Sequence, residues 1–349
     1  MPSLAQSGTG NPKKVAGLKE IAAEAGVSIR TAARALNGQG YVGAQTRKRI
    51  EHAAAKLGYS PNRIARSLRT QKSYEIAIAA WSTDELHIAK IAGFEQAMRR
   101  ARYAVTILMG QQPDTEAAGR EVLETLLEHR PAGVAAFPLP GATMTATVER
   151  LAAAGIPYVI FDSRGEGVDS ARLDRAQGVY EAVLYLAAKG HQRIAYLGTR
   201  DEPSRLDGYL RAFSHLARKP CYMEVTPGTQ PGGGGLDSYE TGRAAAWTFA
   251  EMAERPDAVQ AYSDEMALGF LAGLHELGFQ VPKDVAVVGF DDRRAASLSW
   301  PRLTTVAQPS HELGVAAAEI LLRKIAGEPE PPSGWSRTLP TRLMVRESA

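Results

Sequence analysis

The sequence predicts an α/β protein in which a small all-α unit precedes a larger core of two lobes with parallel sheets. Apolar residues between 18 and 57 recur at helical spacing. From residue 74 onward, short apolar segments alternate with longer helical ones, which is typical of parallel sheets covered by helices on both faces. With 349 residues, the chain has the length of about two or three domains.

The composition is that of an ordinary soluble globular protein, with 44% hydrophobic and 23% charged residues. The single cysteine, Cys221, excludes an intrachain disulfide and fits a reducing compartment. The sequence has no recognisable signal peptide or membrane-spanning segment. We therefore expect a cytoplasmic protein that does not associate with a membrane.

Charge is distributed unevenly along the chain. Residues 1–73 contain 13 of the 41 Lys and Arg residues but only 3 of the 38 Asp and Glu residues. A basic head on a mildly acidic body indicates that the head alone has a polyanionic partner. The alternative is a solvated basic tail, and the helical periodicity of the head argues against it.

The head begins with residues 1–14, which are polar and expected to be disordered, and residues 15–60 are expected to form a helix-turn-helix domain. Gly26 ends the first predicted helix, and Ser28 is a suitable N-cap for the second. The residues on the buried face of the first helix are Leu18, Ile21, Ala22 and Ala25.

The second helix has two different faces. Ala32, Ala35 and Leu36 suit packing against the first helix, whereas the opposite face carries Ile29, Arg30, Ala33, Arg34 and Asn37. Such a helix can enter the major groove of DNA, where an Arg donates two hydrogen bonds to guanine. Thr31 can donate to a phosphate.

A third helix is predicted over residues 44–57, with Ile50, Ala53, Ala54 and Leu57 on its buried face. Three cations, Arg47, Lys48 and Arg49, lie near its start, where the helix dipole disfavours positive charge. We expect a nearby DNA phosphate to relieve that cost.

Residues 61–73 are expected to form a hinge helix and linker. Ser60 as N-cap and Pro61 at the first helical position predict a helix start, but a helix of about eight residues is unstable alone. Leu68 suits insertion between base pairs in the minor groove. The alternative is a linker with an incidental helical turn.

Residues 17–69 resemble the headpiece and hinge of the lactose-repressor (LacI) family of bacterial transcription regulators. The matching segments are IAAEAGVS, the pattern formed by Thr31, Arg34, Leu36 and Asn37, the pair Thr46-Arg47, LGYSPN and ARSL. The resemblance implies that Ile29, Arg30 and Arg34 contact bases, that Asn37 makes a supporting polar contact, and that Ala65 and Leu68 make the minor-groove contacts of the hinge. Thr31, Asn62 and Arg63 are further predicted DNA-binding residues. Ala32, Ala33 and Gly43 depart from the family pattern, and Ala33 lacks a phosphate-contacting hydroxyl.

The body also resembles this family along nearly its full length, through GVYEAVLYLAAKGHQRIAYLG at 178–198, DEMALG at 264–269 and VGFDD at 288–292. The resemblance implies a core like that of periplasmic binding proteins, covering residues 74–349. We expect one lobe at about 74–174 and 308–326, and another at about 175–303 and 327–349. The strand candidates are 75–81, 103–109, 133–138, 158–162, 193–198, 222–225, 258–262, 285–290 and 304–308.

Four residues, Asp162, Arg205, Asp291 and Gln308, match family positions that line the effector cleft, and all follow or end predicted strands. Trp81 and Ser263 are further candidates, although Trp81 suits the core equally well. Two alternatives remain open: Asp291 as a helix cap and Arg205 as an interlobe ion pair.

Departures from the family pattern concentrate in this predicted site. Ser263 and Asp237 stand where sugar-binding members often have Asn and a stacking aromatic, and Arg175 replaces the usual Asn. Arg164, Arg175, Arg293 and Arg294 could make the cleft basic and favour an acidic ligand. A solvated surface is the expected place for most of these arginines.

The sequence predicts no enzyme, because hydrolase, nucleotide-binding and zinc-peptidase motifs are absent, and it predicts no cofactor or metal site. We interpret the chain as a transcriptional regulator, a repressor that binds a pseudo-palindromic double-stranded operator as a homodimer. A carbohydrate or sugar derivative is the expected effector. The alternative is a solute-binding protein without gene control.

Overall fold

The computed structural model describes residues 17–37, 41–59, 73–110, 116–139, 141–163, 167–199, 203–224, 239–332 and 334–349. The chain forms two compact units, Met1–Lys72 and Ser73–Ala349. The predictions for residues 1–14 and for most of the hinge, including Asn62, Arg63, Ala65 and Leu68, lie outside the described residues, as do those for Arg164 and Asp237.

The head consists of three helices, α1 (Leu18–Glu24), α2 (Ile29–Asn37) and α3 (Ala44–Lys56). They enclose a small core of Ile21, Ala22, Ala25, Ala32, Ala35, Ile50, Ala53 and Ala54, as the helical periodicity predicted. Gly26 makes the turn between α1 and α2 with a φ of 61°, a conformation that favours glycine. The Ser28 hydroxyl accepts the backbone N–H of Thr31 at 3.0 Å and so caps α2.

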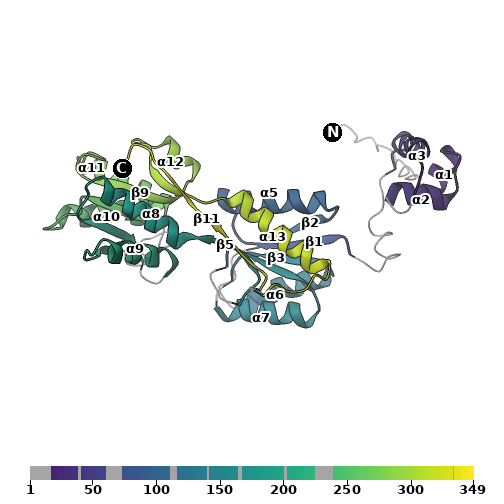
Figure 1. The fold of residues 1–349 in the computed structure, drawn as a ribbon, viewed down its shortest axis with the longest axis horizontal. Coiled ribbons are helices and arrows are strands. Elements are labelled where there is room, and N and C mark those ends of the chain that lie inside the picture. The colour runs from purple at the N-terminus through teal and green to yellow at the C-terminus, as the bar shows by residue number, and fades with distance from the viewer. Residues whose placement is uncertain are drawn as a thin grey trace, which may run out of the picture. The chain divides into compact units, whose positions relative to one another are not determined.

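The first lobe of the core contains a six-stranded sheet in the order β11-β5-β4-β3-β1-β2, in which all neighbouring strands are parallel. Helices α5 (Glu85–Arg100) and α13 (Ser310–Ile325) cover one face, and α6 (Glu116–Glu128) and α7 (Gly141–Ala153) cover the other (Figure 1). The strands are β1 (Glu75–Ala80), β2 (Ala104–Met109), β3 (Gly133–Ala136), β4 (Tyr158–Phe161), β5 (Ser170–Asp174) and β11 (Ser336–Pro340).

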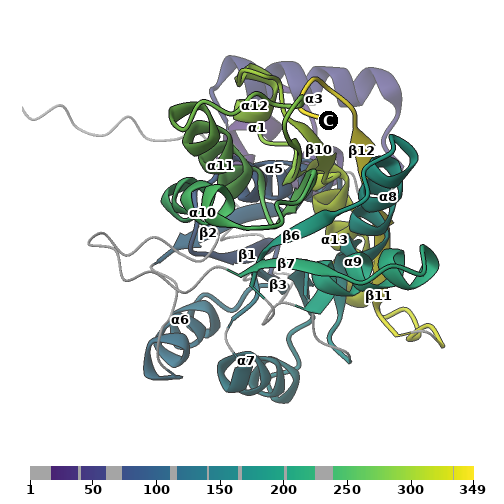
Figure 2. The same cartoon turned by 90° about the vertical axis from the view of Figure 1, so that its left-hand side faces the viewer.

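The second lobe contains another six-stranded sheet, in the order β12-β10-β9-β8-β6-β7, in which only β12 is antiparallel to its neighbour. Figure 2 shows α8 and α9 on one side of this sheet and α10 and α11 on the other. The strands are β6 (Ile194–Gly198), β7 (Cys221–Glu224), β8 (Ala258–Ala261), β9 (Ala286–Asp291), β10 (Thr304–Ala307) and β12 (Arg342–Met344). The helices are α8 (Arg175–Ala188), α9 (Pro203–His215), α10 (Tyr239–Glu251), α11 (Asp264–Glu276) and α12 (Arg294–Leu298).

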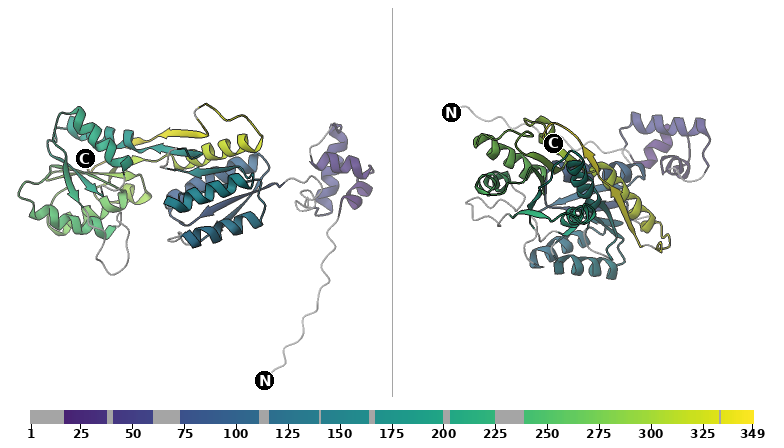
Figure 3. Two further views of the ribbon diagram at one scale, coloured as in Figure 1. Left: turned by 90° about the horizontal axis from the view of Figure 1, so that it is seen from below. Right: turned by 60° about the vertical axis from the view of Figure 1, so that its left-hand side comes forward.

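The C-terminal segment corrects the predicted lobe boundaries. The sequence predicts residues 327–349 wholly in the second lobe, but β11 pairs in parallel with β5 of the first sheet, and only β12 joins the second. In Figure 3 the yellow β11 segment runs beside the first lobe before the chain ends in the second. β5, β11 and β12 were not predicted, because short strands with many polar residues lack a clear apolar signal.

Helices α5 and α13 approach each other unusually closely. A Cβ atom at Gly314 would lie 1.9 Å from the carbonyl oxygen of Lys90, so only glycine allows this crossing. The crossing fixes the backbone of Lys90 in the interior of the first lobe.

Within the described residues, no helix has both the length and the hydropathy needed to span a bilayer.

Candidate functional site

The exposed side of α2 carries the side chains that the sequence assigns to base reading. Ala32 and Ala35 face the head's core, whereas Ile29 is 51% exposed and Arg30 and Arg34 point to solvent. We call Ile29, Arg30 and Arg34 the recognition face. It combines two guanidinium groups with an apolar side chain, which suits contacts with base edges in the major groove.

Thr31 and Asn37 are the two residues on α2 that are predicted to support the base contacts. The Thr31 hydroxyl lies 2.8 Å from that of Ser28, so it already takes part in the cap of α2. The backbone of Asn37 ends α2, but its side chain lies outside the described residues.

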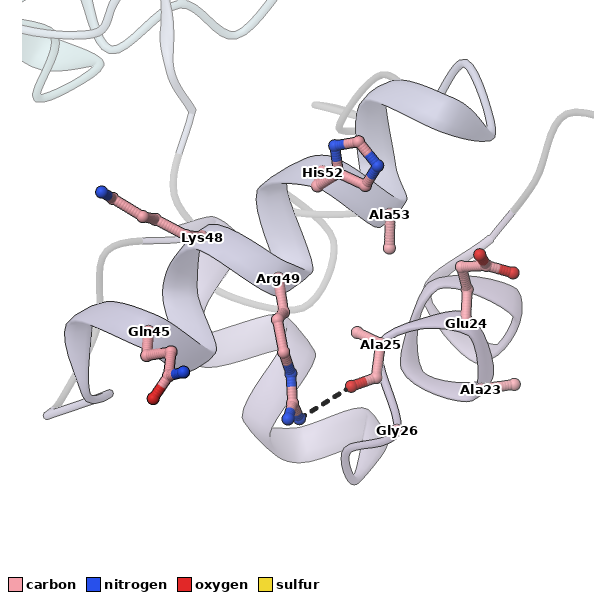
Figure 4. Close-up of a pocket in the computed structure, with 9 residues that line it drawn as sticks. All are labelled: Ala23, Glu24, Ala25, Gly26, Gln45, Lys48, Arg49, His52 and Ala53. Atoms are coloured by element: carbon pink, nitrogen blue, oxygen red, sulfur yellow. Dashed lines mark hydrogen bonds between the residues drawn. The ribbon is translucent and has the colours of Figure 1, made fainter.

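The arginines at the start of α3 do not need a DNA phosphate to offset their charge. Arg47 donates to the carbonyl of Ala35 at 3.1 Å, near the end of α2. Arg49 donates to the carbonyl of Ala25, the C-cap of α1, at 2.9 Å (Figure 4). Helix C-termini carry partial negative charge and unpaired carbonyls, so each arginine stabilises the end of a preceding helix. The expected phosphate is therefore unnecessary for these two residues.

Lys48 differs from its neighbours. Figure 4 shows it pointing away from Ala25, while Arg49 turns towards the end of α1 across a hollow also lined by Gln45 and His52. Lys48 is exposed and points away from the helix end that Arg49 contacts, so its ammonium group is available to a phosphate.

In the core, three predicted effector residues form one cluster at the carboxyl ends of the second sheet. Arg205 donates to Asp291 at 3.1 Å, and the Gln308 amide donates to the same carboxylate oxygen. We call Arg205, Asp291 and Gln308 the second-sheet cluster. The Arg205 guanidinium also lies 4.2 Å and 4.3 Å from the ring centres of Tyr262 and Phe290, which fixes its plane.

One of the two alternative roles is wrong. Asp291 does not cap the following helix, since the N-cap of α12 is Arg293 and the backbone N–H of Arg293 donates to Asp264 at 2.7 Å. Arg205 pairs with Asp291, which ends a strand of its own lobe.

Asp162 lies at the end of β4, in the first lobe, and contacts two buried cations. Lys90 donates to it at 3.0 Å, and Arg175 donates through both terminal nitrogens, one of them at 2.9 Å. We call Lys90, Asp162 and Arg175 the junction cluster; each residue is at most 6% exposed. Burial alone would raise the pKa of Asp162, but the charges and hydrogen bonds of Arg175 and Lys90 outweigh it and hold this pKa well below its usual range.

The sequence names Arg175 among four arginines that could make the cleft basic, with a solvated surface expected for most of them, and it gives no signal for Lys90. Both Arg175 and Lys90 are buried against Asp162, so Arg175 is not one of the solvated arginines. Lys90 sits in the middle of α5, where a lysine gives no signal by itself. Of the other described arginines in question, Arg294 is exposed and Arg293 lies 3.8 Å from Asp291.

The two clusters are close enough to interact electrostatically. The charge of Arg175 lowers the pKa of Asp291, a smaller effect than burial, which raises it, and than the opposing charges of Arg205 and Arg293. Asp162 and Asp291 also share an unusual backbone, with φ values of 58° and 128°. Non-glycine residues at positive φ are uncommon and concentrate at functional sites.

The remaining candidates are less well suited to a ligand. Trp81 is partly buried and packs against the first-lobe core, which favours the structural alternative. The Ser263 hydroxyl accepts the N–H of Met266 at 3.2 Å and caps α11. Within the described residues, no group of three or more His, Cys, Asp or Glu side chains is arranged to hold a metal ion.

Asp264 is a buried carboxyl that sequence reasoning did not single out. It accepts from the Thr305 hydroxyl and from the Arg293 backbone, and its side chain is fully buried. Burial, together with the charge of Asp291, raises the pKa of Asp264 to about 7.

Comparison with known proteins identifies the family. The model of "Bacterial regulatory proteins, lacI family" matches residues 17–62, and that of "Periplasmic binding protein-like domain" matches residues 183–349. The transcriptional regulator CelR of Thermobifida fusca is 33% identical over 354 residues, covering 95% of this chain and 97% of CelR. The chain belongs to the lacI family. This LacI-family protein is a DNA-binding transcriptional regulator with an effector domain, and it is not an enzyme.

Solved structures of other LacI-family proteins share this architecture. The lac repressor dimer bound to operator and the anti-inducer ONPF aligns with a TM-score of 0.77 and 26% identity, covering 96% of this chain and 99% of that one. The complex of the regulator CelR with cellobiose aligns with a TM-score of 0.67 and 28% identity, covering 96% and 100%.

The two cations Arg49 and Lys48 of this LacI-family protein should respond differently to substitution. Arg49→Ala removes a charged hydrogen bond from the end of α1 and should destabilise the head by about 1–2 kcal/mol. Hydrogen exchange of the α1 amides in the full chain measures this effect. Lys48→Ala is the matched control and should leave exchange unchanged while reducing the salt dependence of DNA binding. Equal exchange in both variants would contradict the assigned role of Arg49.

Asp264 should make the stability of this LacI-family core depend on pH. Its pKa is higher in the folded chain than in the unfolded one, so folding favours the protonated form, and stability falls as pH rises through about 7. Between pH 6 and 8 the expected loss is about 1.4 kcal/mol, measured by urea unfolding. Asp264→Asn removes the titrating group and should flatten this part of the profile; an unchanged slope in the variant would refute the assignment.

Proposed function

We propose that this LacI-family regulator is a cytoplasmic repressor that binds a pseudo-palindromic operator as a homodimer and responds to a small effector held at the strand ends of its core. The observation that carries the first part is the recognition face. Ile29, Arg30 and Arg34 are exposed together on α2, while the same helix buries its alanines. Two such faces in a symmetric dimer would read two half-sites.

Exposed apolar residues support self-association. Ile107 and Met109 alternate along the edge strand β2 and are 43% and 49% exposed. Ile88 lies in the first turn of α5 and is 49% exposed. In the second lobe, Leu298 and Trp300 are 71% and 90% exposed. A second copy of the chain is the proposed occupant of these surfaces, and the related lac repressor has been solved as a dimer on its operator.

The second-sheet cluster supports the proposed effector site. Arg205 offers an oriented guanidinium, and Asp291 and Gln308 offer polar atoms at the carboxyl ends of parallel strands, where ligands of such sheets bind. The related CelR has been solved with cellobiose. We propose a carbohydrate or sugar derivative as the effector of this protein as well, and a change in lobe arrangement as the signal to the head.

The recognition face can be tested by selecting binding sites from random double-stranded DNA. Arg30→Ala and Arg34→Ala should each weaken operator binding by about 1–3 kcal/mol and relax the preference at one base pair of each half-site. Lys19→Ala, which removes an exposed cation from α1, is the control and should leave base preference intact. Unchanged preference in both arginine variants would refute the assignment, and the absence of any selected sequence would refute operator recognition itself.

The proposed dimer surface can be tested with the two exposed tryptophans. Trp300→Glu places a charge in the apolar surface and should raise the dimer dissociation constant at least tenfold in sedimentation equilibrium. Trp247→Glu, on α10 and 39% exposed, is the matched control and should leave the dimer intact. Operator affinity should also fall in Trp300→Glu, because a monomer places only one head on one half-site. A wild-type chain that remains monomeric would contradict the proposal.

A further inference from the structure

Arg175 is a buried arginine between the carboxyl ends of the two sheets. It donates to Asp162 of the first lobe, and its charge also acts on Asp291 of the second. It is also the first residue of α8, immediately after β5, so it lies where the chain passes from the first sheet to a helix of the second. A group that binds Arg175 is therefore in a position to affect both lobes.

The backbone around Arg175 is held in place by close packing. Asp174 caps α8 by accepting the N–H of Gln177 at 3.0 Å, and its own carbonyl accepts the Thr341 hydroxyl at 3.0 Å. A Cβ atom at Gly208 would lie 2.0 Å from the carbonyl oxygen of Ala176, so α8 and α9 touch at the residue after Arg175. The guanidinium is thus presented from a rigid base.

The carboxylates at the strand ends are already used by cations of the protein. Asp162 accepts three hydrogen bonds from Lys90 and Arg175, out of the roughly four that a carboxylate can accept. Asp291 accepts from Arg205 and Gln308, and Arg293 lies 3.8 Å away. A neutral sugar needs such acceptors for its hydroxyl groups and would find most of those of Asp162 already in use.

The described part of this region contains several cations. Lys90, Arg175, Arg205 and Arg293 lie beside the ion-paired carboxylates Asp162 and Asp291. A third carboxyl, Asp264, has a pKa near 7. Guanidinium and ammonium groups make strong, charge-assisted hydrogen bonds with carboxylates and phosphates.

Two polar atoms in the region have a free hydrogen-bonding position. In the part of the chain that the structure describes, the Nε of Arg293 and the Oε1 of Gln308 are buried without a hydrogen-bond partner. The first can donate to an anion, and the second can accept from a ligand hydroxyl. Buried polar groups usually have a partner, and a ligand bound in this region would supply one to each of these atoms.

We propose that the effector is a small organic anion with a carboxylate or phosphate group, and that Arg175 binds this group through its two terminal nitrogens. This inference rests on the proposed effector site. Arg175 would exchange Asp162 for the ligand anion, and Asp162 would keep its ion pair with Lys90, so no carboxylate is left unpaired. The hydroxyl groups of the ligand would contact Gln308.

Inorganic phosphate is the probe for the anion site. The melting temperature of the full chain should rise saturably as phosphate replaces chloride at constant ionic strength, beyond the general stabilisation that phosphate gives any protein. Arg175→Asn should weaken the apparent phosphate affinity at least tenfold. Arg337→Asn removes an exposed arginine paired with Glu319 and is the matched control, with wild-type affinity expected.

A wild-type chain without a saturable phosphate response would overturn the inference. Equal affinity in Arg175→Asn would also overturn it, since the phosphate would then bind elsewhere, such as the basic head. If Arg175→Asn fails to fold, Arg175→Lys gives the answer. It keeps the charge but loses the two-nitrogen contact, so its affinity should fall several-fold, and unchanged affinity would refute the assigned contact.

Matched ligands then test the chemical class. Glucose 6-phosphate and gluconate should each bind more tightly than glucose in calorimetry, and Arg175→Asn should remove the difference. Tighter binding of the neutral sugar, unaffected by Arg175→Asn, would refute the inference while leaving the proposed function intact. Conversely, if Arg175-dependent anion binding persists but no operator is selected from random DNA, the proposed function fails and the anion site stands.

Discussion

The burial of two strand-end carboxylates, Asp162 and Asp291, is the constraint on which the core's organisation depends. A buried charge must be paired or it destabilises the fold by several kcal/mol. Each aspartate therefore draws cations from other elements: α5 and α8 supply Lys90 and Arg175 to the first, and α9 supplies Arg205 to the second. Both aspartates adopt positive φ, which directs their side chains away from the regular path of the strand.

In the head, cationic side chains are also paired with negatively polarised oxygens, but these oxygens belong to backbone carbonyls and not to carboxylates. Its core consists largely of alanines, so apolar burial alone contributes little to its stability. Arg47 and Arg49 add charged hydrogen bonds from α3 to the ends of α2 and α1. Two hydrogen bonds from α3 thus hold the other two helices near their ends, and the exposed side of α2 presents Ile29, Arg30 and Arg34 to solvent.

The proposed role of Arg175 connects ligand binding with the transmission of a signal between the lobes. A LacI-family regulator must convert ligand binding into a change at its head, which requires an element with two arrangements. The junction cluster has this property in principle, since Asp162 can remain paired with Lys90 when Arg175 takes another partner. Arg175 lies where β5 of the first sheet meets α8, which packs on the second sheet. A change of its partner would therefore affect the packing of both sheets.

Periodicity and family motifs are local signals, so the fold class, the three head helices, nine of the strands and the strand-end location of Arg205, Asp291 and Gln308 can be predicted from the amino-acid sequence. The partner of each polar side chain follows only from the folded chain. The tertiary structure places β11 in the first sheet, gives Arg47 and Arg49 carbonyl partners, and buries Lys90 and Arg175 against Asp162. Partners such as Lys90 and Asp162 are 72 residues apart in the chain, and no local pattern encodes a contact of that range.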